Sequence, residues 1–271
     1  MLSSAHPLPD TLRQARKAQR ISQLELALRL GVSQRHISFV EGGRARPSRD
    51  LLLAWLHALE APLILRNEAL LQAGYAPVYA ATPLEDPALE TINQALGQLL
   101  MAHDPMPALV MDAQWNLVRL NRGGQWLAAT LMPSSTALPD SSPMNLLDLL
   151  IHPEGLTRSV INLEEVGPDL LVRLRQEAAA QPSLAPKVES FAALLRDRLG
   201  DQALQSRLVT PAAPVLTTRY ATPYGELAFF AMFTTFGTPQ DITLASLRVE
   251  HLFAADAATQ TILNQQVAME P

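Results

Sequence analysis

The stretch Ser22–Pro47, SQLELALRLGVSQRHISFVEGGRARP, decides the fold of the first part of the chain. Ser22 is a favourable N-cap for a helix. Gly31 predicts the end of that helix, because glycine adopts the positive φ angle of a helix C-cap without steric cost. Ser33 caps a second helix, which the Gly42-Gly43 pair ends. The pattern is typical of a helix-turn-helix, in which the second helix enters the major groove of DNA.

The first of these two helices has further signals of a helix start and of a buried face. Glu25 lies three residues after Ser22, which completes the sequence pattern of a capping box. The apolar residues expected to form its buried stripe are Leu24, Leu26, Ala27, Leu28 and Leu30. In the second helix, Ile37 and Val40 are the apolar positions.

Three more helices are expected around this pair. After a loose arm at Met1–Pro9, a helix capped by Asp10 runs to about Arg20. Ser48 caps a fourth helix, and a fifth runs from about Leu63 to Ala73. Trp55 lies in the apolar stripe of the fourth helix, so we interpret it as a core residue and not as a ligand contact.

The composition allows a large core and excludes several classes of site. The 271 residues suggest two domains, and 48% of them are hydrophobic while 17% are charged. Because the chain has no cysteine, disulfide bonds, thiolate metal ligands and cysteine nucleophiles are excluded. Neither a signal-peptide pattern nor a run of about 18 apolar residues is present, so we expect a cytoplasmic protein that does not enter a membrane.

The charge is distributed unevenly along the chain. The net charge is −5, but residues 1–80 hold ten basic and six acidic residues, a net of +4. Residues 81–271 hold eleven basic and twenty acidic residues, a net of −9. Positive charge therefore concentrates on the expected helix-turn-helix, as nucleic-acid binding requires, and the acidic remainder would repel phosphate.

The second part of the chain is expected to combine helices with five strands. A linker rich in proline and alanine, Gly74–Pro87, precedes a helix at about 88–102. Two strands at 108–111 and 115–120 are followed by a helix that Asn121 caps. The later elements are expected as helices at 145–151, 156–180 (in two pieces broken near Gly167-Pro168) and 187–199, and as strands at 215–221, 226–235 and about 242–253. Five strands with flanking helices in this order suggest a PAS-like sensor fold.

Two resemblances agree with this division. SQLELALRLGVSQRHISFVEGG, with the RxRPS run after it, resembles the five-helix DNA-binding domain of the XRE and lambdoid phage-repressor family. The strand pair followed by Asn121, the LRQEAA helix and the YATPYGELAFFAMF strand resemble the PAS-like ligand-binding domain of MmyB-like transcription regulators. The resemblance implies an α+β chain. Residues 1–76 would form an all-α, lambda-repressor-like DNA-binding domain, and residues 77–104 a linker with a connecting helix. Residues 105–271 would form a PAS-like domain with a five-stranded antiparallel sheet, for ligand binding and dimerisation.

The expected DNA contacts lie on the second helix of the motif and on its flanks. Gln34, by resemblance to the phage repressors, reads a base, and the chemistry of its amide suits adenine. Arg35 can fork onto guanine, whereas Phe39 either touches a thymine methyl group or packs within the protein. The full set of expected DNA contacts is Gln23, Ser33, Gln34, Arg35, His36, Ser38, Phe39, Arg44 and Arg46. Arg44 and Arg46 are expected to hold phosphate, as is Gln23 at the start of its helix.

Another arginine of the motif is interpreted as structural. Arg16 and Glu41 match a buried ion pair of the phage repressors, which ties the first helix to the end of the third. One such domain reads only about 4–6 base pairs, so useful specificity requires a homodimer on a near-palindromic operator in double-stranded DNA.

The strand ELAFFAMFTTF is apolar on both faces, so it needs two covers. One cover is the helical core; the other is either a ligand or a second subunit. Arg219, beside Tyr220, is a candidate to anchor a carboxylate. The full set of candidate ligand contacts is Arg119, Asn121, Trp126, Arg219, Tyr220, Phe230, Met232 and Thr234. We hypothesise a small apolar or amphipathic effector such as a fatty acid.

The sequence contains no motif that indicates a catalytic site. The six histidines lack metal-ligand spacing, and no nucleophile elbow or phosphate-binding glycine loop is present, so we expect neither an enzyme nor a metal or cofactor site. The alternative function is a constitutive repressor or antitoxin-like DNA binder, whose C-terminal domain binds a protein and no small molecule.

Overall fold

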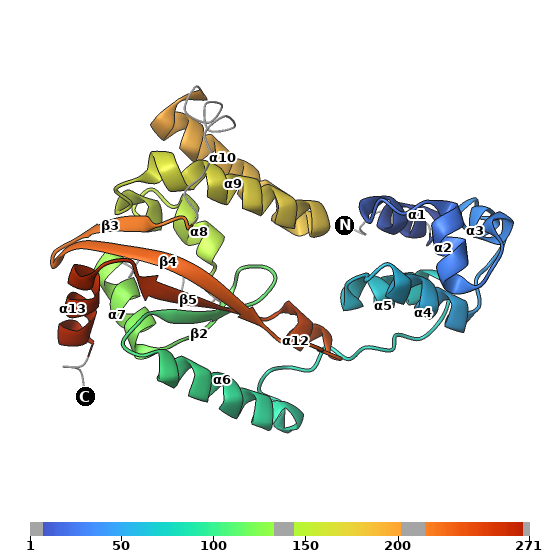
Figure 1. Cartoon of the computed structure of the whole chain (residues 1–271), viewed down its shortest axis with the longest axis horizontal. Helices are drawn as coiled ribbons and strands as arrows, with labels where there is room; N and C mark the ends of the chain where they lie inside the picture. The colour runs from blue at the N-terminus through green and yellow to red at the C-terminus, as the bar shows by residue number, and fades with distance from the viewer. Residues whose placement is uncertain (1–7, 133–143, 202–214, 268–271) are drawn as a thin grey trace. The chain divides into compact units, whose positions relative to one another are not determined.

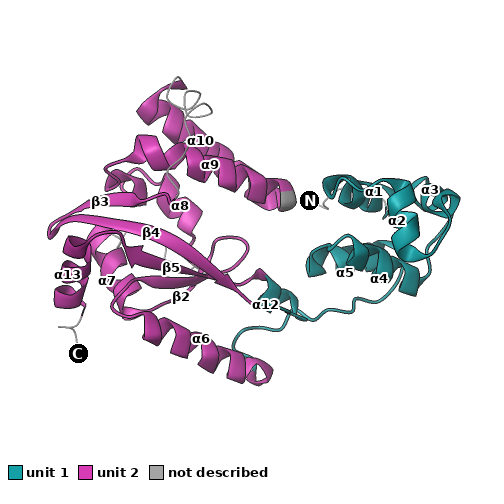
Figure 2. Cartoon of the chain, viewed as in Figure 1, with its two compact units in different colours: residues 1–86, 237–245 teal, residues 87–236, 246–271 magenta. Residues whose placement is uncertain are grey.

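The chain forms two compact units in the computed structural model, which describes residues 8–132, 144–201 and 215–267 (Figure 1). Unit 1 comprises Met1–Asp86 and Gly237–Ala245, and unit 2 comprises Pro87–Phe236 and Ser246–Pro271 (Figure 2). Unit 1 therefore includes a short segment that lies far along the sequence.

Unit 1 contains the five helices expected of a helix-turn-helix domain. They are α1 (Leu8–Ala18), α2 (Gln23–Leu30), α3 (Gln34–Glu41), α4 (Arg49–Ala58) and α5 (Leu63–Gln72). The side chains of Ser22, Ser33 and Ser48 cap α2, α3 and α4, each accepting a hydrogen bond from the backbone N–H three residues later. The helix α1 begins at Leu8, two residues before the expected start; the arm at 1–7 lies outside the described residues.

The capping box at the start of α2 is only half formed. The Ser22 hydroxyl accepts from the Glu25 N–H at 3.0 Å, as predicted. The Glu25 carboxylate instead accepts a hydrogen bond from Arg29, one turn along the helix, at 2.7 Å. The charged partner forms the stronger bond, so Glu25 is drawn forward along α2.

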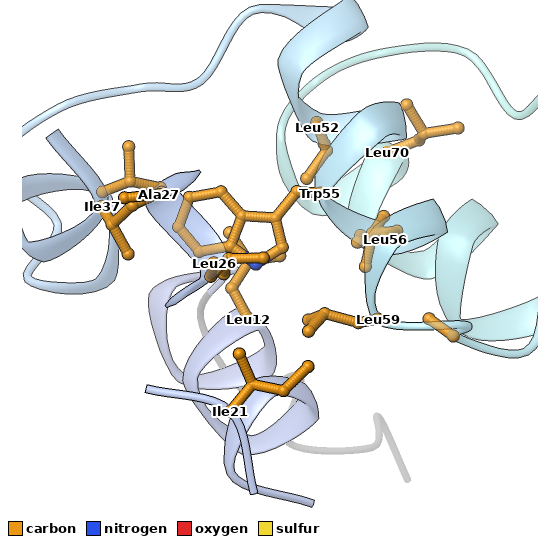
Figure 3. Packing of buried hydrophobic residues seen from close by; sticks show 13 residues of the cluster. Leu12, Ile21, Leu26, Ala27, Ile37, Leu52, Trp55, Leu56, Leu59 and Leu70 are labelled. Atoms are coloured by element: carbon orange, nitrogen blue, oxygen red, sulfur yellow. The ribbon is translucent and has the colours of Figure 1, made fainter. Parts of the chain in front are cut away.

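The core of unit 1 is built around Trp55, which is completely buried (Figure 3). The side chains around it are Leu12, Leu26, Ala27, Ile37, Leu52, Leu56 and Leu59. The expected apolar stripe of α2 was too wide, because Leu24 and Leu28 are exposed. These two leucines lie one turn apart on the far side of a two-turn helix, whereas Leu26 and Ala27 are buried in the core and Leu30 packs against it.

A buried ion pair joins α1 to α3. Arg16 forks onto Glu41: its Nε donates to Oε1 at 2.6 Å and its Nη2 to Oε2 at 2.8 Å. The Glu41 side chain is 2% exposed. Burial alone would raise the pKa of Glu41, but hydrogen bonds from Arg16 and Gln23, with the charges of Arg16 and Arg13, outweigh burial and lower it. The structure thus gives Arg16 the structural role that the resemblance implies.

Unit 2 is built on a five-stranded antiparallel sheet with flanking helices, as expected. The strands are β1 (Ala108–Met111), β2 (Leu117–Leu120), β3 (Thr218–Thr222), β4 (Gly225–Thr235) and β5 (Arg248–Ala254), in the order β2-β1-β5-β4-β3. The α-helices of this unit include α6 (Glu90–His103), α7 (Arg122–Leu131), α8 (Leu146–Ile151), α9 (Leu163–Ala180), α10 (Ala185–Leu199) and α13 (Ala257–Gln266). Short 3-10 turns lie at Pro87–Leu89, Leu156–Arg158 and Pro182–Leu184. The helix α6, assigned to the connecting region by sequence, contacts β1 within unit 2.

The helix α9 and the strand β2 differ from the expected elements. The helix α9 is not broken at Gly167-Pro168 but runs through both residues. A side chain at Gly167 would meet Leu195 of α10 at 2.8 Å, so this glycine permits close packing of α9 on α10 instead of ending the helix. The strand β2 begins at Leu117 and not at Trp115, because Asp112 accepts hydrogen bonds from the N–H groups of Gln114 and Asn116 and lengthens the turn.

The end of the chain holds two helices that the sequence analysis did not predict. Residues expected to begin the last strand form α12 (Ile242–Ser246), because Asp241 accepts from the N–H groups of Thr243 and Leu244. The helix α13 starts where Asp256 caps it, with a 2.7 Å bond from the Thr259 N–H. The first of these helices carries apolar and β-branched residues, ITLAS, which favoured a strand interpretation of that stretch.

The ion pair between Arg16 and Glu41 predicts a large and pH-dependent loss of stability on substitution. Replacing Glu41 with Gln leaves a buried guanidinium without its counter-charge, and we expect the free energy of unfolding to fall by about 3 kcal/mol. Since the folded-state pKa of Glu41 is lowered, the wild-type contribution is complete above the ordinary carboxyl pKa of 4.5. It is lost as the pH falls through the folded value. Urea unfolding of both proteins between pH 3 and 7 measures this.

The matched control is Glu25→Gln, which removes the same charge from an exposed Glu–Arg pair on α2. We expect it to change the free energy of unfolding by less than about 1 kcal/mol at every pH. Equal losses in the two variants would contradict a special role for the buried pair.

Candidate functional site

The exposed side of α3 presents the residues expected to read DNA. Gln34, Arg35 and Ser38 are exposed, and His36 is half-buried. The Ser33 hydroxyl accepts from the His36 N–H at 3.1 Å, so Ser33 caps the helix that carries the others. The opposite side of α3 buries Ile37, Val40 and Glu41 in unit 1, which fixes the helix in its orientation.

Phe39 lies between two of the expected DNA contacts. The guanidinium carbon of Arg35 lies 5.0 Å from the centroid of the Phe39 ring, and that of Arg44 lies 5.8 Å from it. These are cation–π distances. The Phe39 carbonyl also accepts from the Arg44 N–H at 2.8 Å, which fixes the loop after α3 to the helix. One half-buried ring thus holds a residue of α3 and a residue of the following loop.

Gln23 has a structural contact as well as a position at a helix start. Its Nε2 donates to Glu41 at 2.9 Å, beside the buried ion pair. Gln23 is the first residue of α2, where backbone N–H groups have no partner within the helix and suit a phosphate oxygen. Arg44 and Arg46 are both exposed after α3, so the basic loop stands at the edge of the same motif.

The sheet of unit 2 has two faces of different character. Neighbours across antiparallel strands share a face, and residues two apart along a strand do so too. The register pairs Phe230 with Phe253 and Met232 with His251, and His103 of α6 contacts both rings of β5. We call the face that carries Phe230, Met232, His251 and Phe253 the outer face. Arg219 and Thr234 lie on it as well. The alternate residues form the inner face, against α7, α8 and α9.

The strand β4 changes its surroundings along its length. On the inner face Leu227 and Phe229 are buried in the helical core. On the outer face Phe230 is half-buried, whereas Met232 is 56% exposed. The helices therefore cover the inner face only at Leu227 and Phe229; from residue 231 to 235 both faces of the strand are exposed among the described residues.

Asn121 and Arg119 lie together but are engaged by the protein itself. Asn121 Oδ1 accepts from the N–H groups of Ala108 and Gly124, and its Nδ2 donates to two backbone carbonyls. Arg119 donates through both Nη atoms to Asn93 of α6. Both border an open groove of about 540 Å³ between α6, β2 and α7, lined by Gly97, Leu100, Met101, Asp104, Arg119, Leu120, Asn121, Arg122 and Gln125. The groove is wide, but the hydrogen bonds of Asn121 are already satisfied by backbone groups.

The other candidate ligand contacts are divided between the faces. Arg219 pairs with Glu226 at 3.4 Å on the outer face, where both side chains are exposed. Tyr220 lies on the inner face, and burial, with the charge of Glu250, raises the pKa of its phenol. Trp126 of α7 is buried and contacts the Tyr224 ring. The candidate residues therefore do not converge on one cavity in the described part of the chain.

A charged and aromatic cluster on the inner face was missed by sequence reasoning. It consists of Trp115, Arg173, Glu177, Phe233, Arg248 and Glu250. Its members come from a turn, from α9 and from two strands, so no local spacing connects them. The one available signal is that Arg248 and Glu250, two apart in a strand, place two charges on a single face.

The cluster is organised around Glu177. This carboxylate accepts hydrogen bonds from Arg248 Nη1 (3.0 Å to each oxygen), from Arg173 Nε (3.0 Å) and from Trp115 Nε1 (2.8 Å). Burial would raise the pKa of Glu177, but Arg248, Trp115 and Arg173 outweigh burial and lower it. For Glu250 burial prevails, and the pKa of that carboxyl is raised despite the charges of Arg173 and Arg248.

Comparison with known families matches residues 92–265 to the MmyB-like transcription regulator ligand binding domain, over more than half of the chain. The chain belongs to the MmyB-like transcription regulators. In this MmyB-like regulator, residues 12–64 match the helix-turn-helix family, so the N-terminal motif is a DNA-binding one. The predictions of an XRE-type helix-turn-helix and of an MmyB-like domain are both confirmed.

A curated relative is also an HTH-type transcriptional regulator by name. The regulator is 40% identical over 66 residues to the uncharacterized HTH-type transcriptional regulator y4dL of Sinorhizobium fredii (strain NBRC 101917 / NGR234). The match covers 24% of this chain and 34% of the relative, so the chain spans about a third of the relative's length. Among solved structures, the chain was compared with an RNA-binding Light-Oxygen-Voltage receptor, to which it is 14% identical. The comparison covers 96% of this chain and 63% of that chain, with a TM-score of 0.25.

Two kinds of feature are absent from the described residues. These residues contain no helix long and apolar enough to cross a membrane. Nor do they contain a group of three or more histidine, aspartate or glutamate side chains placed to hold a metal ion. As a member of a transcription regulator family, the protein belongs to a class that is not normally enzymatic.

The position of Phe39 predicts how its substitution affects DNA binding. Replacing Phe39 with Leu keeps an apolar side chain for a thymine methyl group but removes the ring that holds Arg35 and Arg44. We expect affinity for an operator selected in vitro to fall about 5- to 30-fold, since each exposed cation–π contact contributes about 0.5–1 kcal/mol. Fluorescence anisotropy titration measures this change.

Phe39→Tyr is the matched control, because it keeps the ring and should bind within about twofold of wild type. Full affinity in Phe39→Leu would instead assign the residue to a thymine contact or to packing alone.

Proposed function

We propose that this MmyB-like regulator is a cytoplasmic homodimer that binds a near-palindromic DNA operator and responds to a small apolar or amphipathic effector. The single observation that carries the proposal is the combination in one chain of a helix-turn-helix and an MmyB-like ligand-binding domain. Effector binding would change the spacing of the two DNA-binding units, because DNA tolerates only spacings that match its helical turn.

The DNA contacts follow from the exposed side of α3. Gln34 and Arg35 would read base edges, with Ser38 and His36 beside them. Gln23, Arg44 and Arg46 would hold phosphates on either side. Support comes from the net charge of +4 over residues 1–80 and from the exposed side chains of Gln34, Arg35, Ser38, Arg44 and Arg46.

The outer face of β4 is our proposed contact between subunits. Phe230, Met232 and Thr234 form a row there, and Met232 is 56% exposed. A strand with an apolar residue left in water gains when a second copy covers it, because burying apolar surface is favourable by about 25 cal/mol per Å². An effector would then occupy the inner face, near Tyr220, with Trp126 in the neighbouring core.

The effector class rests on the apolar residues of the sheet. A fatty acid fits the combination of apolar side chains and arginines, and it is the specific compound class that we propose to test first. The competing function, a constitutive or antitoxin-like DNA binder with a protein partner, requires the same DNA-binding unit but no small molecule.

Two arginines separate base reading from phosphate binding. Arg35→Ala should reduce discrimination at one base position by about 1–3 kcal/mol. Arg46→Ala should weaken all sequences alike and lower the slope of log K against log salt by about 1. Binding titrations over a salt series on single-base operator variants measure both quantities.

The control for these variants is Arg29→Ala, which removes a positive charge from α2 where Arg29 pairs with Glu25. If Arg35→Ala and Arg46→Ala bind the operator as Arg29→Ala does, the assignment of α3 as the reading helix is wrong.

Native mass spectrometry tests dimerisation and effector binding together. The expected spectrum is a dimer that releases a small molecule on denaturation. Met232→Glu should give a monomer, whereas Val172→Glu, at an exposed apolar residue of α9, should stay dimeric. A dimer without bound mass that also ignores added fatty acid would favour the protein-partner function. A dimeric Met232→Glu would exclude the outer face of β4.

A further inference from the structure

The Arg248 guanidinium has an unused hydrogen-bonding edge inside unit 2. Its Nη1 donates to Glu177, but Nε and Nη2 are buried and have no partner among the described residues. The Arg248 side chain is 16% exposed, so these donors have also lost most contact with water. Buried donors without acceptors destabilise a protein, so a ligand that accepts from Nε and Nη2 would supply hydrogen bonds that the described residues leave unmade.

The Nε and Nη2 groups of Arg16, in unit 1, show which chemical group this edge of an arginine binds. Arg16 uses its Nε and Nη2 to fork onto the two oxygens of Glu41, at 2.6 and 2.8 Å. A planar edge with two parallel N–H groups matches the two oxygens of a carboxylate. In unit 2 no protein carboxylate takes this position: Glu250, two residues along β5 on the same face, makes no hydrogen bond with Arg248 in the described residues.

The charges around Arg248 leave one positive charge to be neutralised. Arg173 and Arg248 share the single carboxylate of Glu177. Burial raises the pKa of Glu250, which favours its neutral form. Two guanidinium groups against one carboxylate correspond to a site for one anionic group.

Two aromatic rings, those of Trp115 and Phe233, lie beside the Arg248 guanidinium. The guanidinium carbon of Arg248 lies 4.3 Å from the Trp115 ring centroid and 5.8 Å from that of Phe233. The guanidinium carbon of Arg173 also lies over the Phe233 ring, 4.1 Å from its centroid. Phe233 is 37% exposed, so solvent already reaches one of the two rings beside the Arg248 guanidinium.

We propose that Arg248 anchors the carboxylate of a small organic acid with an apolar body, bound on the inner face of the sheet between Trp115 and Phe233. This inference rests on the proposed function, because it specifies the effector of the same domain. The acid would displace Phe233 from Arg248 and receive both free N–H groups, and its apolar body would lie against the rings. Arg173 supplies a second positive charge beside Phe233.

Arg219 provides the matched comparison. It was the carboxylate anchor expected from sequence, and it lies on the outer face in an exposed pair with Glu226. A ligand bound there would compete with water and with Glu226. Arg248 differs because its free donors are buried and already lack water.

The test compares acids with their neutral amides on the full chain. Isothermal titration calorimetry measures the binding of octanoate and octanamide, and of benzoate and benzamide, to wild type and to Arg248→Lys and Arg219→Lys. We expect wild type to bind at least one acid ten times more tightly than its amide. Arg248→Lys keeps a positive charge but loses the planar edge, so its preference should fall below threefold. Arg219→Lys should keep the wild-type preference.

Folding is checked by circular dichroism and by operator binding, which neither variant should change. Where Arg248→Lys does not fold, Arg248→Met fills the same volume without the charge. A wild-type protein that binds acid and amide alike overturns the proposal, as does an Arg248 variant that keeps the preference for the acid. Either result leaves the proposed function intact if native mass spectrometry still finds a bound molecule, so the two failures are distinguishable.

Discussion

The pairing of β4 with β5 is the constraint on which the rest of unit 2 depends. Seven consecutive residue pairs, from Phe229 with Ala254 to Thr235 with Arg248, fix which side chains share a face. A slip of one residue would move every side chain of β4 to the opposite face. Phe233 would then leave the inner cluster and Met232 would enter it. The charged cluster and the exposed outer row are thus two results of one register.

The two buried arginine sites show different uses of the same chemistry. In unit 1 all three guanidinium nitrogens of Arg16 donate hydrogen bonds, to Glu41 and to the Ile21 carbonyl, and its pKa is raised, chiefly by the hydrogen bond to Glu41. Such an arrangement ties helices together and has no capacity left for a ligand. In unit 2 Arg248 is only partly satisfied. Unsatisfied buried groups concentrate at functional sites because stability there is subordinate to binding.

Much of unit 1 could be predicted because its signals are local. Serine caps and Gly31, with a φ angle of 66°, mark helix ends within four residues of the features they control. The exposed Leu24 and Leu28 were beyond this reasoning, since the depth of a stripe depends on which neighbours cover it. In unit 2 the five strands were predictable from apolar runs. The helices at 242–246 and 257–266 were not, because aspartate caps are ambiguous without tertiary contacts.

The effector site illustrates a second limit. The sequence analysis named Asn121 and Arg119 as candidate ligand contacts, but what those side chains bond to depends on α6 and on backbone carbonyls up to 21 residues away in sequence. The cluster around Arg248 joins positions as far apart as 115 and 250. Separation on that scale leaves no pattern that one sequence can reveal.

The segment Gly237–Ala245 joins β4 to β5, yet it belongs to unit 1. Asp241 accepts hydrogen bonds from the Thr82 N–H and hydroxyl, and the Ile242 N–H donates to the Ala80 carbonyl. The backbone therefore crosses between the units three times instead of once. A DNA-binding part cut out together with its linker would therefore leave behind the Asp241 carboxylate that holds that linker at Thr82.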